Sequence, residues 1–495
     1  MELKVKDMDI ATGGSLIVIL NEYDAKKFDI HVSDRIKITK GKKTETAVVD
    51  IAESQRAVPR GKIGVFEETV HSLNLKHNDK VSIKLARKPL SLIHIKKKLD
   101  GEKLTKKEID QIVWDIVNNK LSETEITYFV AACYTHRLSS KETILLTKAM
   151  AKHGDTLKLK RYPIIDKHCI GGVPGNRTTM VVVPIIAAAG LTIPKTSSRS
   201  ITSPAGTADS MEVLADVSFP LKKMKSIVNK TNASIVWGGA LNLAPADDKI
   251  IRVEKPLGID AESQLLASIM AKKHSVSSTH IIIDIPVGKG AKVQTKKEAL
   301  RLKKDFEDIG KKLNKHIKVV ITKGEEPIGN GIGPALEARD VLWLLKRDSN
   351  APNNLEKKCI QLASEIFKLA GMKNYKNKAK DILDSGRAYK KMKEIIKAQN
   401  GNPNIDPNKI KIGKFNYTIE SKKSSIVKAI NNNLVSKIAR VAGAPSAKGA
   451  GIFLHKHVGN KITKGSKLFT IYAESKERLN YAKYILKQAK VFVLK

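Results

Sequence analysis

The spacing of apolar residues changes along the chain, and each change predicts a different kind of domain. In residues 1–86, short apolar runs such as SLIVIL (15–20) and KVSIKL (80–85) are separated by Gly, Asp and Asn. Short runs between turn residues are typical of β-strands. We therefore expect a small N-terminal domain that is β-rich and barrel-like.

Residues 87–160 follow a helical period instead. Ile109, Ile112, Val113 and Ile116 would share one face of a helix. Three capping boxes, in which a glutamate follows a hydroxyl residue by three positions, mark the starts of helices. The pairs are Thr105 with Glu108, Ser122 with Glu125, and Ser139 with Glu142. This part of the chain is expected to form a helical lobe.

Strand-like and helical runs alternate in residues 161–400. Examples of these runs, in chain order, are YPIID (162–166), TTMVVVPIIAAAG (178–190), STHIIIDIPV (278–287) and IKVVIT (317–322). Such alternation predicts an α/β domain with a largely parallel sheet, part of whose chain could return to the helical lobe. Residues 400–408 have the composition of a linker, and residues 410–495 return to an α+β pattern. The predicted fold class is thus a multidomain α/β and α+β protein.

The charge of the chain suggests anionic ligands. Lys and Arg number 90 against 50 Asp and Glu, which gives a formal net charge of +40. A nucleic-acid binder would use this charge to neutralise phosphates. However, the lysines are spread along the chain, and aromatic residues, which stack on single-stranded bases, make up only 5%. Attraction of small phosphorylated anions is the simpler explanation, so we do not expect nucleic acid as the main partner.

Cysteine usage and hydropathy favour a cytoplasmic protein. Cys133, Cys169 and Cys359 are widely spaced and odd in number, which suits a reducing compartment better than a disulfide framework. The sequence MELKVKDMDIATGG at the start lacks the apolar segment of a signal peptide. No apolar run is long enough to span a bilayer, so we expect no membrane partner.

The first candidate site is the stretch DKHCIGGVPGN, residues 166–176. It follows the apolar run YPII and precedes a helical run from Thr178, so it combines a strand end, a glycine-rich loop and a helix N-terminus. Free backbone amides at such a position bind anions, and glycine lets the backbone approach a ligand. The stretch is not a Walker A motif. A tight turn that needs glycines only for its geometry explains the same residues equally well.

The second candidate is KTSSRSITSPAGT, residues 195–207, in which hydroxyl residues surround Arg199. Hydroxyl groups and a guanidinium suit a phosphate ester. The alternative is a solvated polar loop. Apolar segments on both sides and the nearby first candidate weaken that alternative.

A third candidate lies in residues 252–273. A helical run after Asp260 carries Gln264, Ser268 and Lys272 at four-residue spacing, so these side chains would share one face. A polar stripe on an otherwise buried helix suggests a cleft wall. The simpler alternative, an N-cap at Asp260 followed by a solvated stripe, is slightly favoured by the local pattern alone.

A fourth, weak candidate is the loop VGKGAK, residues 287–292, which follows the apolar run IIIDIP. Ligands of α/β sheets bind at the C-terminal ends of strands. A glycine loop at this place is consistent with such a site but does not define one.

In this order, the four stretches resemble the thymidine phosphorylase superfamily. The resemblance covers roughly residues 90–495, with DKHCIGGVPGN as its specific signature, and it includes IKKKLDGEKLTKKEI, SRSITSPAGTADSMEVL, IPVGKGAKV and AKGAGIFLHKHVGNKITKG. Residues 1–86 have no counterpart in the bacterial nucleoside enzymes and look like the additional N-terminal domain of archaeal AMP phosphorylases. Hydroxyl residues also replace the Gly and His of the bacterial enzymes in the second stretch, as a ligand with a 5′-phosphate would require.

The resemblance implies a role for each matching residue. Asp260 matches the proton donor of the family, and Lys167 matches a residue that binds the attacking phosphate. Arg252 and Lys272 match base-binding positions of the pyrimidine enzymes. The implied ligand contacts are Gly172, Ser198, Arg199, Ser200, Ile201, Thr202, Ser203, Thr207, Ser268 and Lys292.

Two residues depart from the family pattern. Cys169 stands where the family usually has Ser, and a thiol is a weaker hydrogen-bond donor than a hydroxyl, so inorganic phosphate is expected to bind less tightly. Pro204 stands where a smaller residue or Thr is usual.

The activity implied by the resemblance is that of a pentosyltransferase in nucleotide salvage or degradation. It would split AMP with inorganic phosphate into adenine and ribose 1,5-bisphosphate, with CMP and UMP left open as further substrates. Phosphate is a co-substrate, no metal or other cofactor is expected, and the assembly would be a homodimer or a larger homo-oligomer. A thymidine or uridine phosphorylase is the nearest alternative. A phosphoribosyltransferase would need Mg²⁺, and we find no paired-acid motif for it.

Overall fold

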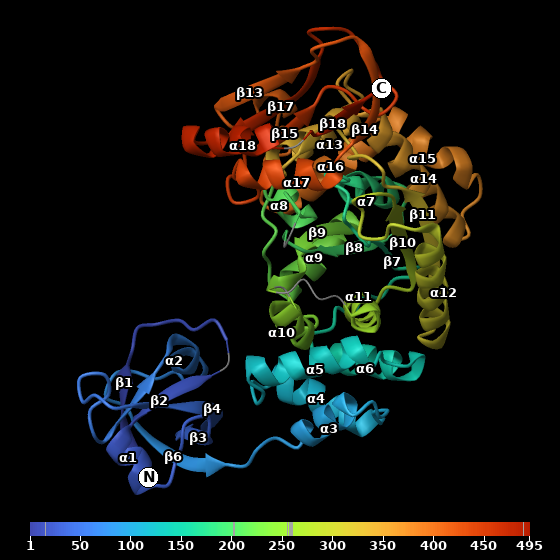
Figure 1. The fold of residues 1–495 in the computed structure, drawn as a ribbon. Helices are drawn as coiled ribbons and strands as arrows, with labels where there is room; N and C mark the ends of the chain where they lie inside the picture. Colours follow the sequence, from blue (N-terminus) through green and yellow to red (C-terminus); the bar gives the residue numbers. More distant parts are fainter. Residues whose placement is uncertain (15, 201–202, 255, 257–260, 489) are drawn as a thin grey trace. The chain divides into compact units, whose positions relative to one another are not determined.

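The computed structural model describes residues 1–14, 16–200, 203–254, 256, 261–488 and 490–495, which form two compact units (Figure 1). The first unit contains residues 1–154 and 244–271, and the second contains residues 155–243 and 272–495. Apolar clusters of its own stabilise each unit. The predicted fold class is confirmed, because the units combine a barrel, a helical lobe, parallel sheets and an antiparallel C-terminal part.

A closed barrel forms from residues 1–86, with the strand order β1-β5-β2-β4-β3-β6. β1 closes the ring because it pairs with β5 in parallel and with β6 in antiparallel register. Alternate residues such as Val18 and Leu20 point into the core. The elements are β1 (Glu2–Asp7), β2 (Ile17–Asn21), α1 (Glu22–Lys27), β3 (Arg35–Lys40), β4 (Lys43–Ala52), β5 (Lys62–Val65), α2 (Glu67–Leu73) and β6 (Lys80–Ala86).

The helical lobe completes the first unit. All three predicted capping boxes are present: each hydroxyl accepts a backbone hydrogen bond from the glutamate, whose carboxylate accepts one in return. Ile250 and Ala267, from the chain that returns at residue 244, join the core of the lobe. The helices are α3 (Ser91–Leu99), α4 (Lys106–Val117), α5 (Glu123–Thr135), α6 (Ser140–Lys152), α10 (Pro245–Glu254) and α11 (Glu262–Ser275). The last residues of α11 belong to the second unit.

The second unit is built on parallel strands. One sheet has the order β11-β10-β7, and β8 pairs with β9 in parallel. A single bridge between Ile164 and Thr192 connects the two sheets. The elements are β7 (Ile165–Cys169), α7 (Thr178–Ala188), β8 (Ile193–Ser197), α8 (Thr207–Met211), α9 (Leu221–Thr231), β9 (Ala233–Trp237), η1 (Gly238–Ala240), β10 (His280–Val287), α12 (Lys296–Lys312), β11 (His316–Lys323), α13 (Pro334–Lys346), α14 (Asn353–Leu369), α15 (Tyr375–Asp384), α16 (Arg387–Ala398) and η2 (Pro407–Lys409).

The run TTMVVVPIIAAAG (178–190), one of the alternating runs named from the sequence, is helical. It forms α7, which is buried on every side between other helices and the strands. A buried helix shows no polar stripe, and its periodicity therefore cannot distinguish it from a buried strand. The helical run that we expected to follow the glycine-rich stretch at Thr178 is present.

The C-terminal part consists of antiparallel sheets covered by helices. One sheet has the order β12-β15-β17-β13, and another has the order β16-β14-β18. The elements are β12 (Gly331–Ile332), β13 (Phe415–Glu420), β14 (Ser425–Ile430), α17 (Asn432–Val441), β15 (Gly451–Leu454), β16 (Lys461–Ile462), β17 (Lys467–Ala473), α18 (Lys476–Gln488) and β18 (Phe492–Leu494).

Candidate active site

The first candidate stretch, residues 166–176, is called the glycine turn below. Its first four residues lie in β7 beside the parallel strand β10, and the rest leads to the N-terminus of α7. Gly171, Gly172 and Gly175 have φ angles of 95°, 89° and 70°. These are values that L side chains rarely adopt, so the shape of the turn requires the glycines. The amides at the start of α7 then lie where an anion can bind them.

Gly172 brings the fourth candidate stretch against the glycine turn. A Cβ atom on Gly172 would lie 2.1 Å from the backbone nitrogen of Lys292 and 2.8 Å from the carbonyl carbon of Ala291. Only a residue without a side chain permits this approach. Two predicted ligand contacts, Gly172 and Lys292, are therefore neighbours in the structure.

The second candidate, residues 195–207, begins in β8, and its residues 197–207, of which 201 and 202 are not described, are called the hydroxyl loop below. It folds back on Gly206, where an added Cβ would lie 2.5 Å from the carbonyl oxygen of Ser198. The carboxylate of Asp209 accepts hydrogen bonds from the backbone amides of Ser200 and Gly206, at 2.7 and 2.8 Å. The Ser200 hydroxyl donates to the carbonyl oxygen of Ser203. Asp209 thus holds Ser200 and Gly206 close together.

Arg199 is engaged by carboxylates. Its guanidinium donates to both carboxylate oxygens of Glu212, at 2.8 and 2.5 Å, and lies over the ring of Trp237. The hydrogen bonds from Arg199, together with Lys448, lower the pKa of Glu212 to about 2. The loop therefore presents hydroxyl groups beside an arginine whose charge is already matched, and a role for Arg199 in binding substrate remains a prediction.

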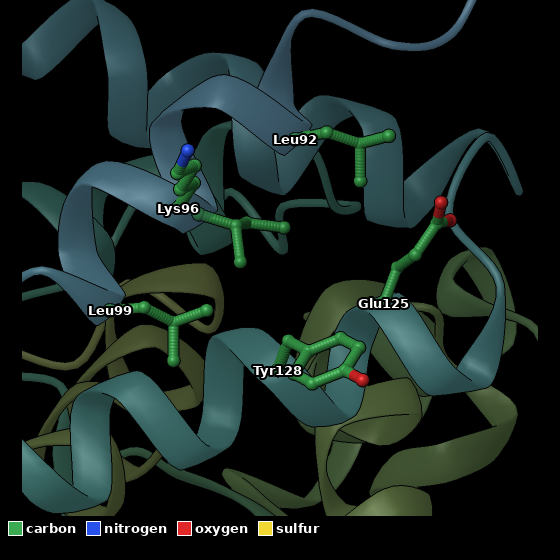
Figure 2. Close-up of a pocket in the computed structure, with 6 residues that line it drawn as sticks. Leu92, Lys96, Leu99, Glu125 and Tyr128 are labelled. Atoms are coloured by element: carbon green, nitrogen blue, oxygen red, sulfur yellow. The ribbon is translucent and has the colours of Figure 1, made fainter.

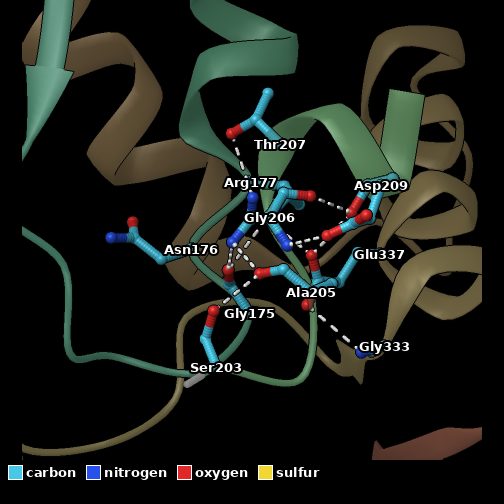
Figure 3. A network of polar contacts seen from close by, with 12 residues as sticks. Gly175, Asn176, Arg177, Ser203, Ala205, Gly206, Thr207, Asp209, Gly333 and Glu337 are labelled. Atoms are coloured by element: carbon cyan, nitrogen blue, oxygen red, sulfur yellow. Dashed lines mark hydrogen bonds and ion pairs between the residues drawn. The ribbon is translucent and has the colours of Figure 1, made fainter. Parts of the chain in front are cut away.

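Arg177, which follows the glycine turn directly, joins it to the hydroxyl loop (Figure 3). Its guanidinium donates to the carbonyl oxygen of Gly175 at 2.9 and 3.0 Å, to the carbonyl oxygen of Ala205 at 3.2 Å and to the hydroxyl of Thr207 at 2.9 Å. The two stretches that were expected to bind anions are thus neighbours in one unit. Arg177 was not among the residues that we predicted from the sequence. Its position between a glycine-rich turn and an apolar helix is the pattern that could have indicated it.

Buried charges lie at the base of the glycine turn. Asp166 is fully buried, and its carboxylate lies 2.9 Å from the Lys273 ammonium and 3.6 Å from that of Lys195. Burial would raise the pKa of Asp166, but these two ammonium groups lower it. Burial and the charge of Lys273 lower the pKa of Lys195 to about 7.

Lys167, also on β7, belongs to a second buried charge group, which is centred on Asp284 of the neighbouring strand β10. Its ammonium donates to the Thr178 hydroxyl at 2.8 Å and lies 3.9 Å from the carboxylate of Asp284. Lys358 lies 3.1 Å from the same carboxylate. Four buried lysines therefore accompany two buried aspartates around β7 and β10, which leaves an excess of positive charge near the turn.

The thiol at the position of the family serine is protonated. Burial raises the pKa of Cys169. The side-chain amide of Asn176 donates to the sulfur at 3.3 Å. Whether this thiol weakens phosphate binding remains a prediction.

The remaining predicted residues lie in the first unit or outside the described chain, except Lys272, which lies on α11 in the second unit. Ser268 lies on α11 in the first unit. Arg252 lies 3.7 Å from the carboxylate of Glu123 and donates to the carbonyl oxygen of Gly13. Asp260, Ile201 and Thr202 lie outside the described residues.

Comparisons with known proteins agree on one family. AMP phosphorylases from Thermococcus kodakarensis and Pyrococcus furiosus are each 48% identical to this chain, over 97% of it and 95% of their own length. An AMP phosphorylase from Methanococcoides burtonii is 42% identical, over 100% of this chain and 97% of its own. This chain belongs to the AMP phosphorylase family.

Family profiles divide the chain in the same manner. The profile of the helical bundle domain of a glycosyl transferase family matches residues 93–154, and that of its a/b domain matches residues 161–389. The profile of the pyrimidine nucleoside phosphorylase C-terminal domain matches residues 426–491. The predicted resemblance to this group of enzymes is confirmed.

A solved structure supports the fold alone. Anthranilate phosphoribosyltransferase from Thermus thermophilus is 18% identical, with a TM-score of 0.52, over 62% of this chain and 99% of its own. At this identity the likeness concerns the architecture and not the reaction.

The described residues contain no group of three or more His, Cys, Asp or Glu side chains arranged to hold a metal ion. Within the same residues, no helix has both the length and the apolar character needed to cross a membrane.

A pocket in the helical lobe lies apart from the predicted site residues of that unit. Side chains of α3 and α5 point into it, chiefly apolar ones (Figure 2). Its lining residues are Leu92, Ile95, Lys96, Leu99, Glu125 and Tyr128. An apolar lining provides few donors for a phosphate, so this pocket does not suit the expected ligands.

Proposed function

We propose that this chain catalyses the phosphorolysis of AMP, giving adenine and ribose 1,5-bisphosphate. The observation that carries the proposal is the joining of the glycine turn and the hydroxyl loop by Arg177 in one unit. A reaction between two phosphate-bearing substrates needs two oxyanion sites close together. The AMP phosphorylases that are 42–48% identical over nearly the whole chain support the same activity.

In the proposed reaction, an oxygen of inorganic phosphate attacks C1′ of the ribose 5-phosphate. A C–O bond forms at C1′ while the C1′–N9 bond breaks, and the electron pair of that bond leaves with adenine, which takes up a proton. Positive charge develops on the sugar, so catalysis depends chiefly on positioning and on electrostatics. We assign the attacking phosphate to the side of Lys167 and the 5′-phosphate to the hydroxyl loop. The excess of buried lysines near the turn supports the first assignment.

The deciding experiment measures free adenine released from AMP with and without inorganic phosphate. Release that requires phosphate, together with ribose 1,5-bisphosphate in the ³¹P NMR spectrum, is the expected result. Thymidine and uridine are tested in parallel; faster phosphorolysis of either nucleoside than of AMP would replace the proposal with a nucleoside phosphorylase. CMP and UMP in the same assay determine the base preference.

Asp260 is proposed as the proton donor to the leaving base because it matches that residue of the family. We expect Asp260→Asn to lower kcat by about 10²–10⁴-fold with little change in KM, since the proton is needed only as the bond breaks. Steady-state kinetics measure this split. Near-normal turnover in the variant would remove Asp260 from the mechanism.

We also propose that the chain assembles as a homodimer or a larger homo-oligomer, as the family resemblance implies. Light scattering of the purified protein tests this. A mass of 54.5 kDa, that of one chain, would contradict it.

A further inference from the structure

Arg177 occupies a position that neither the sequence analysis nor the family resemblance assigns a role. Its side chain is 12% exposed and is surrounded by acceptors from three segments of the second unit. These are the carbonyl oxygen of Gly175, the Ala205 carbonyl and Thr207 hydroxyl, and the carboxylate of Glu337. A guanidinium has donors in a fixed planar fork, so these contacts determine its orientation.

The hydrogen bond to Thr207 has a chemical consequence. A hydroxyl group has one donor and two acceptor positions, whereas a guanidinium can only donate. Because the Arg177 guanidinium donates to the Thr207 oxygen at 2.9 Å, the hydroxyl must act as the acceptor in this contact. The proton of Thr207 is then directed toward another acceptor. An oxygen of a phosphate group is an acceptor of this kind, and the cation behind Thr207 strengthens the donor.

Glu337 holds Arg177 in place from the opposite side (Figure 3). Its carboxylate lies 2.5 Å from Nε of Arg177 and also accepts hydrogen bonds from the Ser210 hydroxyl at 2.9 Å and the Gly333 amide at 3.1 Å. Glu337 is 1% exposed. Since both oxygens of the carboxylate have partners, it is anchored and the guanidinium is anchored with it.

We propose that Arg177 is a positioning residue for a substrate oxyanion, which it serves by keeping Thr207 a hydrogen-bond donor. The inference rests on the proposed function, which supplies the oxyanion. That group is a phosphoryl group, either of the nucleotide or of inorganic phosphate. A lysine at this position would keep the charge but could not reach Gly175, Ala205, Thr207 and Glu337 together, because its single ammonium lacks the planar fork.

The test compares Arg177→Met, Arg177→Lys, Thr207→Val and the double variant Arg177→Met/Thr207→Val with the parent. KM for AMP is measured at saturating phosphate, and KM for phosphate at saturating AMP. Arg347→Met is the matched control. Arg347 also pairs with two carboxylates, those of Glu356 and Asp384, at 2.8 and 3.0 Å, but it does not contact either loop.

We expect Arg177→Met to raise one of the two KM values by about 10–100-fold, with a smaller change in kcat, because a charge-assisted contact is lost. Thr207→Val should raise the same KM, and adding Arg177→Met to it should have little further effect, since both changes remove the same donor. Arg177→Lys should recover part of the loss. The KM that changes identifies which phosphoryl group Thr207 binds, and Arg347→Met should leave both values within about 2-fold of the parent.

Independent, multiplicative effects of Arg177→Met and Thr207→Val would overturn the proposal, as would KM values within about 2-fold of the parent in Arg177→Met. If Arg177→Met does not fold, Arg177→Lys combined with Thr207→Val provides the same test of coupling. A parent enzyme that shows no phosphorolysis would refute the proposed function instead. In that case, calorimetry measures the affinity of each variant for AMP and for inorganic phosphate. Weaker binding to Arg177→Lys than to Arg347→Met would support the role of Arg177 as a positioning residue, and equal binding would refute that role.

Discussion

In the second unit, the glycine turn and the hydroxyl loop are neighbours, but they contact charged groups of opposite sign: mainly lysines at the turn and carboxylates at the loop. Behind the turn, Lys167 and other buried lysines outnumber the aspartates they contact. In the loop, the carboxylate of Asp209 binds two backbone amides and that of Glu212 binds the Arg199 guanidinium. The turn therefore has surplus positive charge, whereas the loop has its charges matched and presents hydroxyl groups.

The difference indicates that the two regions recognise an anion by different means. A surplus of buried ammonium groups attracts charge, and this attraction is strong where water is excluded. Neutral hydroxyl groups select the geometry of an ester more than its charge. We therefore expect substitutions at the turn to lower activity when they remove charge or crowd the backbone. Substitutions in the loop should lower activity when they remove individual hydrogen-bond donors.

The largest effect is expected from Lys167→Met. It removes an ammonium that is 1% exposed and directed at Thr178 beside the turn. Loss of one preorganised donor of an active site costs about 10²–10³-fold in kcat, so we expect kcat/KM to fall at least that far. The measurement is adenine release from AMP under subsaturating phosphate.

Lys358→Met is the control for Lys167→Met, because it removes another buried lysine that contacts Asp284. It should lower thermal stability in a similar way but reduce activity much less. Equal losses of activity in the two variants would mean that the charge of the cluster matters and the position of Lys167 does not.

A smaller effect is expected from a matched pair of glycine substitutions in the turn. Gly171 and Gly172 both have positive φ, but an added Cβ at Gly171 meets nothing within 4 Å, whereas at Gly172 it meets the Lys292 backbone at 2.1 Å. Both alanine variants carry backbone strain of about 1–3 kcal/mol, and only Gly172→Ala must also displace the loop of Lys292. Its kcat/KM should be lower than that of Gly171→Ala by about 10-fold or more. Equal activities would argue against a site between these two loops.

The smallest effect concerns pH and Lys195, which joins the two regions because it lies on the strand before the hydroxyl loop and contacts Asp166 of the turn. Its pKa of about 7 is below the ordinary value of 10.5. Between pH 7 and pH 10.5 the folded protein therefore binds fewer protons than the unfolded chain. Burial of the charged ammonium lowers the free energy of unfolding by its full amount below pH 7. This destabilisation declines as the pH rises toward 10.5.

The Lys195→Met variant has no ammonium group that could titrate at this position. The Tm of the parent minus the Tm of the variant should therefore rise by about a few degrees between pH 7 and pH 9. Calorimetry at several pH values measures the difference. The exposed Lys222 provides the control, since Lys222→Met should show no such trend. A constant difference between the parent and Lys195→Met would contradict the lowered pKa.

The sequence predicted those features that local chemistry determines. Each capping box satisfies the amides of a helix start through residues three positions apart, and all three predicted boxes are present. The barrel-like domain was predicted from short apolar runs separated by Gly, Asp and Asn. The run from Thr178 was ambiguous because a helix with no exposed face gives the same apolar sequence as a buried strand.

Contacts between distant residues could not be predicted from local patterns. Arg199 looked like a ligand for phosphate, but Glu212, thirteen positions later, matches its charge after the chain turns through α8. Glu337 holds Arg177 across 160 residues of sequence, so no local spacing could have indicated that pair. Only tertiary structure determines whether a charged side chain in a polar loop remains available to a ligand.

The closed ring of strands at the N-terminus has a consequence for how the chain can begin to fold. Every strand of the barrel has a neighbour on both sides within residues 1–86, and its core draws only on side chains from that segment. No strand edge is left to join another sheet, which is the usual route to aggregation of β-rich segments. The strands of this segment can therefore pair with one another before the chain that follows them has been synthesised.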